Sequence, residues 1–118
     1  MTEYVRKKGS RKSLEVAAGE GTSMQVLIGS EEAPNFAFRK FVMDSHGGMP
    51  KHTNLVEHEQ YVLSGSGIIE IAGKTFEISA GDSVYIPGQV PHSYTAGKDG
   101  LEFICVVPNK EDKVKIVK

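Results

Sequence analysis

The chain has 118 residues, 39% hydrophobic and 25% charged, a composition typical of one ordered globular domain. Its formal net charge of -1 gives no electrostatic reason to expect nucleic acid or an anionic membrane as a partner. No apolar stretch approaches the roughly 18 to 20 residues of a transmembrane helix, and no signal-peptide core follows the basic N-terminus. We therefore expect a cytoplasmic location. Cys105 is the only cysteine, which excludes an internal disulfide and a multi-thiolate zinc site.

Short apolar runs bounded by Gly, Pro, Asn, Asp or Ser predict an all-β chain. In chain order, the expected strands are 23–28, 36–43, 59–63, 67–71, 74–78, 83–86, 93–96 and 101–107. Turns are expected between them, at 31–35, 45–50, 72–73, 80–82, 87–91 and 97–100. Strands of this length and spacing favour a sandwich or barrel over parallel β-α-β units.

The organisation expected from this pattern is a single domain over residues 1–118, with a barrel core at about 23–108. Residues 1–22 would form an N-terminal arm and residues 109–118 a C-terminal tail. The basic residues of the arm are either a patch for an anionic partner or, as we favour, a solvated terminus. In the tail, Val114 and Ile116 alternate with lysines, which fits an edge strand or a disordered end equally well.

All four histidines lie in two segments, 46–67 and 81–92. Side chains alternate between faces along a strand, so His52 and Asn54 point the same way, and His58 shares a face with Gln60. In the second segment, His92 opens a strand with Tyr94 on its face. If the segments meet inside a barrel, three imidazoles converge, and neutral imidazole is the commonest protein ligand for first-row transition metals.

The two segments resemble the two signature motifs of the cupin superfamily, whose fold is a small double-sheet jelly roll. The first motif should begin with glycine at position 46, where this sequence has His46, and it ends on Gly65, six residues after His58. Gly81, Pro87 and His92 match the second motif, whereas Gln89 replaces its second glycine and Ala96 its asparagine.

The string from Glu57 to Leu63 resembles the all-histidine subgroup of small bacterial cupins, except that Asn54 stands where the second histidine should be. The resemblance implies a site of His52, Asn54, His58 and His92 for one divalent ion of Mn, Fe, Ni, Co or Zn. Because an amide oxygen is a weaker ligand than imidazole, Asn54 would bind the metal directly, bind it through water, or leave a position open.

The other candidate side chains have both a functional and an ordinary structural interpretation. His46 lies in a glycine turn and is expected at the surface. Glu57 and Glu59 invite a general-base role, but by strand parity they face away from His58, which favours solvated carboxylates on the outer face. Expected pocket residues are Arg39, Gln60, Tyr94, Phe103 and Cys105. Phe103 and Cys105 fit core packing equally well. Arg39 is either an anchor for a substrate anion or a rim residue paired with a carboxylate, and the second is the more common case.

Functionally, the pattern predicts a metal-dependent cupin that binds a small molecule, as an oxygenase-, isomerase- or lyase-type enzyme. The alternative is a non-catalytic module that binds or senses a small ligand or the metal. Small cupins resemble one another in pairing their barrels, so we expect a homodimer. The apolar strand over residues 24–28 would add to a partner's sheet and cover an exposed edge.

Overall fold

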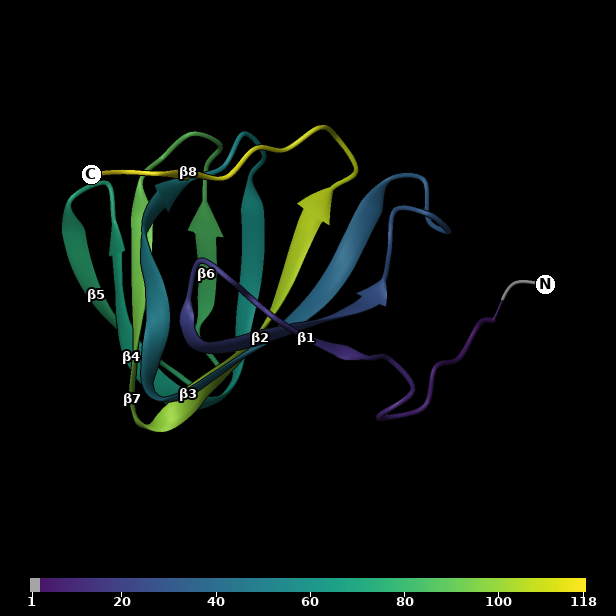
Figure 1. The fold of residues 1–118 in the computed structure, drawn as a ribbon, viewed down its shortest axis with the longest axis horizontal. Coiled ribbons are helices and arrows are strands. Elements are labelled where there is room, and N and C mark those ends of the chain that lie inside the picture. The colour runs from purple at the N-terminus through teal and green to yellow at the C-terminus, as the bar shows by residue number, and fades with distance from the viewer. Residues whose placement is uncertain (1–2) are drawn as a thin grey trace.

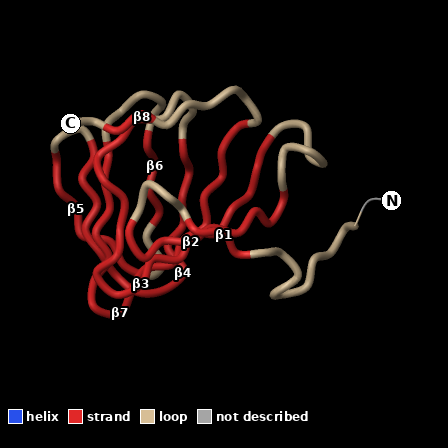
Figure 2. The backbone as a smooth tube through the Cα atoms, in the orientation of Figure 1, coloured by secondary structure: helices blue, strands red, loops and turns tan. Residues whose placement is uncertain are grey.

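The computed structural model describes residues 3–118, and these form strands without any helix (Figure 2). The strands pair into one antiparallel sheet in the order β1-β2-β3-β7-β4-β5, with β6 on β4 and β8 on β3. The sheet curls around a core, and a shorter lobe carries the N-terminal strands (Figure 1). The strands are β1 (Ser13–Glu15), β2 (Glu20–Ile28), β3 (Phe36–Thr53), β4 (His58–Ile71), β5 (Lys74–Ser79), β6 (Ser83–Ile86), β7 (His92–Pro108) and β8 (Lys115–Ile116).

Three strands are much longer than expected, and the turns expected at 45–50 and 97–100 are wrong. β3 runs through the first of these segments and β7 through the second. The glycines and polar residues there produce register shifts in the β3–β7 ladder between Met43 and Gly48. They bend a strand that continues, rather than reversing it, as β-bulges do. β4 bends in the same way at Gly65, which has a φ of 79°.

The short elements follow the sequence pattern. Residues 72 and 73 connect β4 to β5 with positive φ at both Ala72 and Gly73, which suits a tight hairpin. In the C-terminal tail, β8 pairs with β3 through His52–Ile116 and Thr53–Lys115. The edge-strand interpretation of the tail is therefore confirmed, and the tail crosses the end of the barrel where β3 finishes (Figure 1).

Alternation along β4 and β7 separates the interior from the surface. On β4, His58, Gln60 and Val62 are buried, whereas Glu59 and Tyr61 are exposed. The apolar core combines the inward residues of β3, β4, β6 and β7, and its most deeply buried members are Met43, Ile69, Ile86, Leu101, Val62 and Cys105. The buried polar side chains lie beside this core, at the strand ends described below.

The strand that was expected to add to a partner's sheet, at residues 24–28, has less free edge than expected. β2 pairs with β3 on one side, and its residues 23–25 pair with β1 on the other, so this part of β2 offers no exposed edge.

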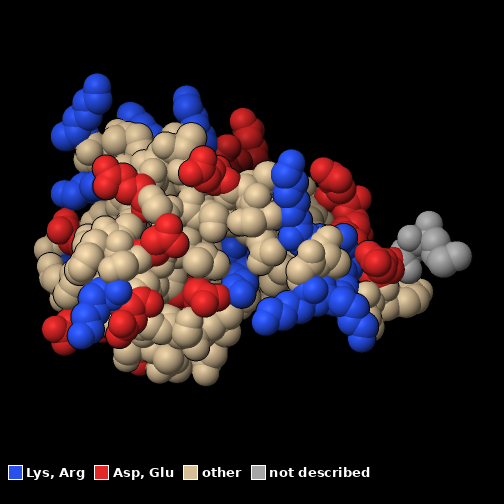
Figure 3. Space-filling model, turned by 60° about the horizontal axis from the view of Figure 1, so that its bottom comes forward, with Lys and Arg blue, Asp and Glu red and all other residues tan. Residues whose placement is uncertain are grey.

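Within the arm, Arg6 forms an ion pair with Glu32, and Arg11 pairs with Glu3 at 3.4 Å. Acidic side chains lie among the basic ones over the face in Figure 3. Among residues 3–118, no helix is long and apolar enough to span a membrane.

Candidate metal centre

Three buried histidines meet where three strands begin or end. His52 lies at the end of β3, His58 opens β4, and His92 opens β7. His52 and His92 are direct partners in the β3–β7 ladder, with ring centroids 4.2 Å apart. The rings of His58 and His92 lie 5.8 Å apart. A hydrogen bond from the Gln89 amide to the Asn54 carbonyl, 2.6 Å long, joins the two loops that carry these residues.

The protonated nitrogen of two of these rings follows from their backbone contacts. His52 Nδ1 lies 2.7 Å from the carbonyl oxygen of Pro50, and His92 Nδ1 lies 2.9 Å from that of Val90. A carbonyl oxygen only accepts, so each Nδ1 is the atom that donates. In the neutral rings, the lone pair then lies on Nε2. Metal-binding histidines are commonly oriented by hydrogen bonds of this kind.

Two buried polar atoms at the same end of the barrel lack hydrogen-bond partners within residues 3–118. These are Nε2 of His58 and Oδ1 of Asn54. The other ring nitrogen of His58, Nδ1, lies 3.2 Å from Cys105 Sγ. Leaving such an atom unpaired costs about 1–3 kcal/mol, so an unpaired nitrogen and an unpaired oxygen beside two free Nε2 atoms suit a bound cation.

The orientation of Asn54 is set by Asp112, in the C-terminal tail. Asn54 Nδ2 donates to Asp112 Oδ2 at 3.1 Å, and a carboxylate only accepts, so the amide oxygen must face the other way. Asp112 Oδ1 also accepts from the backbone amides of Leu55, Val56 and Lys113. Burial alone would raise the pKa of Asp112, but these hydrogen bonds hold the pKa below its usual range. The carboxylate is therefore ionised at neutral pH and keeps accepting.

Electrostatics keep two of the imidazoles neutral. Burial, together with the positive charges of Arg39 and of a protonated His92, lowers the pKa of His58 to about 4. Burial also lowers the pKa of His92 to about 4, against the hydrogen bond to the Val90 carbonyl, which raises it. Both rings are therefore uncharged at pH 7, which is the form that coordinates metals.

Within residues 3–118, no group of three or more His, Cys, Asp or Glu side chains is placed so that it could hold a metal ion. The candidate donors are three imidazoles and one amide. The three rings lie near one another, with centroids 4.2 and 5.8 Å from that of His92, but they are not positioned as a metal-binding group.

The histidines form part of the wall of a pocket of about 280 Å³. This volume lies just below the usual range for small-molecule sites, roughly 300 to 1,000 Å³. Gln60 donates to the Tyr94 hydroxyl at 2.7 Å, and the two polar groups lie among apolar and aromatic side chains. The lining includes Arg39, Gln60, Tyr94 and Phe103 of the expected residues, together with Leu14, Val16, Met24, Phe41, Met43, Met49 and Val114.

Cys105 is fully buried and does not line this pocket. Its sulfur lies behind the wall, 3.5 Å from Arg39 Nη2 and 3.7 Å from Gln60 Nε2. His46 is exposed, as expected, although it lies in the bend of β3 and not in a turn, and Glu59 faces outward. Asp112 was missed by sequence reasoning, because nothing distinguishes it from the charged residues around it in the tail.

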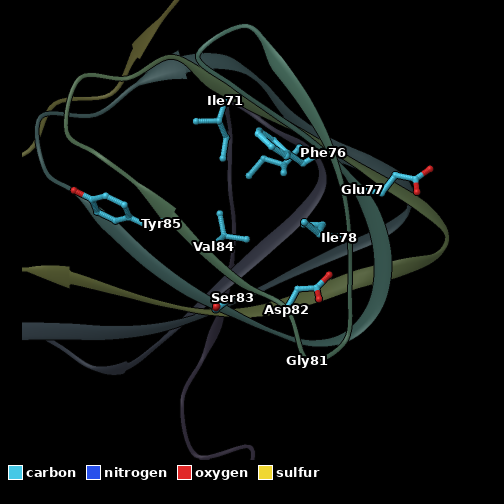
Figure 4. A pocket seen from close by; sticks show the side chains of 10 residues that line it. Ile71, Phe76, Glu77, Ile78, Gly81, Asp82, Ser83, Val84 and Tyr85 are labelled. Carbon is cyan, nitrogen blue, oxygen red and sulfur yellow. The ribbon is translucent and has the colours of Figure 1, made fainter.

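A larger hollow, of about 620 Å³, lies between β5 and β6 and is lined by none of the histidines (Figure 4). Ile71, Phe76, Ile78 and Val84 gather inside it, while Tyr85 points away from them (Figure 4). It contains no His, Cys, Lys or Arg, and Asp82 is engaged by the backbone amide of Ser79. The smaller pocket is therefore the better candidate site, since it combines donors, a cation and an apolar wall.

The family model for the cupin domain matches residues 39–107. The chain belongs to the cupin family. Among solved structures, the polyketide cyclase RemF from Streptomyces resistomycificus has a TM-score of 0.88 and 28% identity, covering 100% of this chain and 87% of that one. A cupin-2 domain from Rhodospirillum rubrum has a TM-score of 0.80 and 22% identity, covering 100% of this chain and 82% of that one. The resemblance noted in the sequence and the jelly-roll fold are both confirmed.

Two curated relatives match over shorter segments. The dimethylsulfoniopropionate lyase DddW of Ruegeria pomeroyi is 51% identical over 41 residues, which are 35% of this chain and 27% of that protein. An uncharacterized protein of Methanocaldococcus jannaschii is 34% identical over 50 residues, which are 42% of this chain and 40% of that protein. The chain thus matches less than half the length of either curated relative.

All four glycine positions of the two cupin motifs have a positive φ in this structure, including the two where this chain has another residue. Gly65 and Gly81 have φ values of 79° and 95°. His46 and Gln89, which stand at the motif's other two glycine positions, also have positive φ, at 60° and 66°. Left-handed backbone is costly for a residue with a Cβ, so this cupin keeps the family's backbone at two positions without the residue best suited to it.

Proposed function

We propose that this cupin binds one divalent transition-metal ion through Nε2 of His52, His58 and His92 and through Oδ1 of Asn54. The observation that carries the proposal is the pair of buried, unpaired atoms, His58 Nε2 and Asn54 Oδ1, beside two rings whose Nδ1 atoms are already engaged. A mixed set of nitrogen and oxygen donors suits manganese, iron, cobalt, nickel or zinc.

We further propose that the protein is an enzyme of the isomerase or lyase type that acts on a small molecule. A metal ion in this site would supply Lewis acidity toward an oxygen of the substrate. The likeness to a cyclase over the whole chain and to a lyase over a shorter segment supports a reaction that rearranges or eliminates. The mostly apolar pocket of about 280 Å³ limits the substrate to a small molecule.

Tyr94 is the residue that we assign to proton handling. Burial raises the pKa of its hydroxyl above the usual value, so the side chain stays protonated. Since Gln60 Nε2 donates to the Tyr94 oxygen, the hydroxyl proton remains free to be donated. Tyr94 also packs edge-on against His92, with ring centroids 5.9 Å apart. It would therefore donate a hydrogen bond to a substrate oxygen next to the imidazoles.

Metal titration tests the site. We expect about one equivalent of Co²⁺ or Zn²⁺ to bind the untagged protein, and His52→Ala with His58→Ala and His92→Ala to abolish binding. His46→Ala is the matched control, because that histidine is exposed and separate from the pocket. Undiminished binding by the triple variant, with loss in the His46 variant, would refute the assignment.

Turnover separates an enzyme from a binding module. The metal-loaded protein is incubated with dimethylsulfoniopropionate and with a library of small carbonyl and carboxylate compounds, and products are followed by mass spectrometry. We expect a metal-dependent product that Tyr94→Phe slows by at least tenfold, since hydrogen-bond donors of this kind typically contribute that much. Saturable binding without any product would instead support the non-catalytic module.

A further inference from the structure

Arg39 places a positive charge inside the barrel. It lies on the inward face of β3 between Ala37 and Phe41, and it is half-buried beside the pocket. Its cross-strand partner on β7 is Cys105, whose sulfur lies 3.5 Å from Arg39 Nη2. A thiol is a weak acceptor, so this contact compensates little for the water that the guanidinium loses.

Within residues 3–118, no carboxylate forms an ion pair with Arg39. The ion pairs there join other residues, and Arg39 Nε is buried without an acceptor. Two carboxylates line the same pocket, Asp112 and Glu15, and neither forms an ion pair with Arg39. The oxygens of Asp112 already accept from Asn54 and from three backbone N–H groups. A guanidinium presents five donors in a fork that matches a carboxylate, and here most of them remain free.

A row of aromatic rings runs from Arg39 to the histidines. The Arg39 guanidinium lies 5.2 Å from the centroid of the Phe41 ring. Phe41 stacks on Phe103 at 5.2 Å and 15°, and Phe103 stacks on Tyr94 at 5.3 Å and 13°. Tyr94 then meets His92 edge-on. The pocket thus has a cation at one end of a flat apolar wall and the imidazoles at the other.

From this arrangement we propose that the pocket takes a small organic carboxylate with a flat apolar body, and that Arg39 binds the carboxylate. The inference rests on the proposed function, because it describes the ligand of the same pocket. It goes further by naming the charge and shape of that ligand. The rim-residue interpretation of Arg39 requires an acidic partner, and the described residues supply none.

Benzoate and its neutral isostere benzamide are suitable probes. Both are titrated into metal-free protein in the presence of a chelator, and binding is followed by NMR at the amides of Phe41, Tyr94 and Phe103. We expect benzoate to bind at least tenfold more tightly than benzamide, and Arg39→Gln to remove that preference. Because no metal is present, failure of the metal proposal would leave this result unchanged.

The controls separate a specific anion site from a general charge effect. Lys40→Gln removes a cation from the same strand, and Lys40 pairs with Glu102 at 3.0 Å outside the pocket. This variant should keep the benzoate preference. Arg39→Lys keeps the charge without the fork and should bind benzoate with intermediate affinity, which also covers the case in which Arg39→Gln does not fold. Equal binding of benzoate and benzamide, or benzoate binding unchanged in both Arg39 variants, would overturn the proposal.

Discussion

The metal-free protein should lose stability as the pH falls below 6.5, because His58 and His92 resist protonation in the folded state. Burial lowers both pKa values from 6.5 to about 4. Between these pH values, the unfolded chain takes up protons that the folded chain does not, so falling pH favours unfolding. At pH 7.5, both states are almost entirely neutral at these positions and the effect is nearly absent.

The size of the effect follows from the two pKa values. A displacement from 6.5 to about 4 corresponds to about 3 kcal/mol for each ring once the pH has fallen to 4. At pH 5 the cost is about 2 kcal/mol for each ring by the same linkage relation. Together the two rings remove about 4 kcal/mol at pH 5, which is a large part of the 5–15 kcal/mol typical of a small protein.

Urea unfolding at pH 7.5 and pH 5, with a chelator present, measures this loss. Glu59 changes the pH dependence of stability in the opposite direction. Burial, a hydrogen bond to Glu57 and repulsion by the charge of Glu57 raise the pKa of Glu59 to about 7. Folded Glu59 then takes up its proton at a higher pH than the unfolded chain does, which adds stability as the pH falls. The residue is exposed, so the contribution is small, and a Glu59→Gln background removes it. An unfolding free energy that is the same at both pH values in that background would refute the reasoning.

Four further outcomes are expected. Gln89→Gly should raise the unfolding free energy by about 0.5–1 kcal/mol in thermal or urea unfolding, since Gln89 is exposed and has a φ of 66°. Asp112→Asn should weaken metal binding by about tenfold in chelator competition, with Glu111→Gln as the control, because an amide at 112 no longer dictates which end of Asn54 faces the site. Asn54→His should tighten metal binding by about tenfold, or 1.4 kcal/mol, in the same assay, and equal or weaker binding would mean that residue 54 does not reach the metal. Light scattering at micromolar concentration should give the mass of a homodimer, and a monomer would contradict that expectation.

Much of the fold followed from local sequence patterns. Strand parity correctly separated the buried His58 and Gln60 from the exposed Glu59, because the period of two is a property of any extended chain. The hairpin at Ala72 and Gly73 was also predictable from its turn residues. These features depend on neighbours in sequence, and propensity and patterning report such neighbours well.

The strand bends were not predictable in the same way. Segments 45–50 and 97–100 contain the residues of a turn, and the local sequence does not distinguish a reversal from a bulge in a continuing strand. The difference arises from the partner: β3 and β7 pair with each other on both sides of these bends. Only the long-range ladder decides that the chain continues.

The candidate site was likewise predictable only in the features that depend on neighbours in sequence. Its histidines were predicted because motif spacing and strand parity both act locally. The partners that orient them were not, since the Pro50 and Val90 carbonyls contact the rings only in the folded backbone. The absence of an acidic partner for Arg39 is likewise a property of the whole described structure, and sequence reasoning favoured the more common paired arrangement.

Asn54 and Asp112 are best understood together. A histidine at position 54 would have nitrogen atoms alone to offer, whereas an asparagine amide has a donor end and an acceptor end of nearly equal size. Without a neighbour of fixed polarity, either end of Asn54 would face the histidines, and the NH₂ end cannot coordinate a cation. Asp112 removes this ambiguity because its carboxylate accepts from Nδ2, and the C-terminal tail is held in place by three further hydrogen bonds to that same carboxylate. In the proposed metal site, the Asn54 that replaces a histidine of the all-histidine pattern would depend for its orientation on Asp112, a tail residue outside the family motif. The two residues should therefore be exchanged together when the proposed site is redesigned.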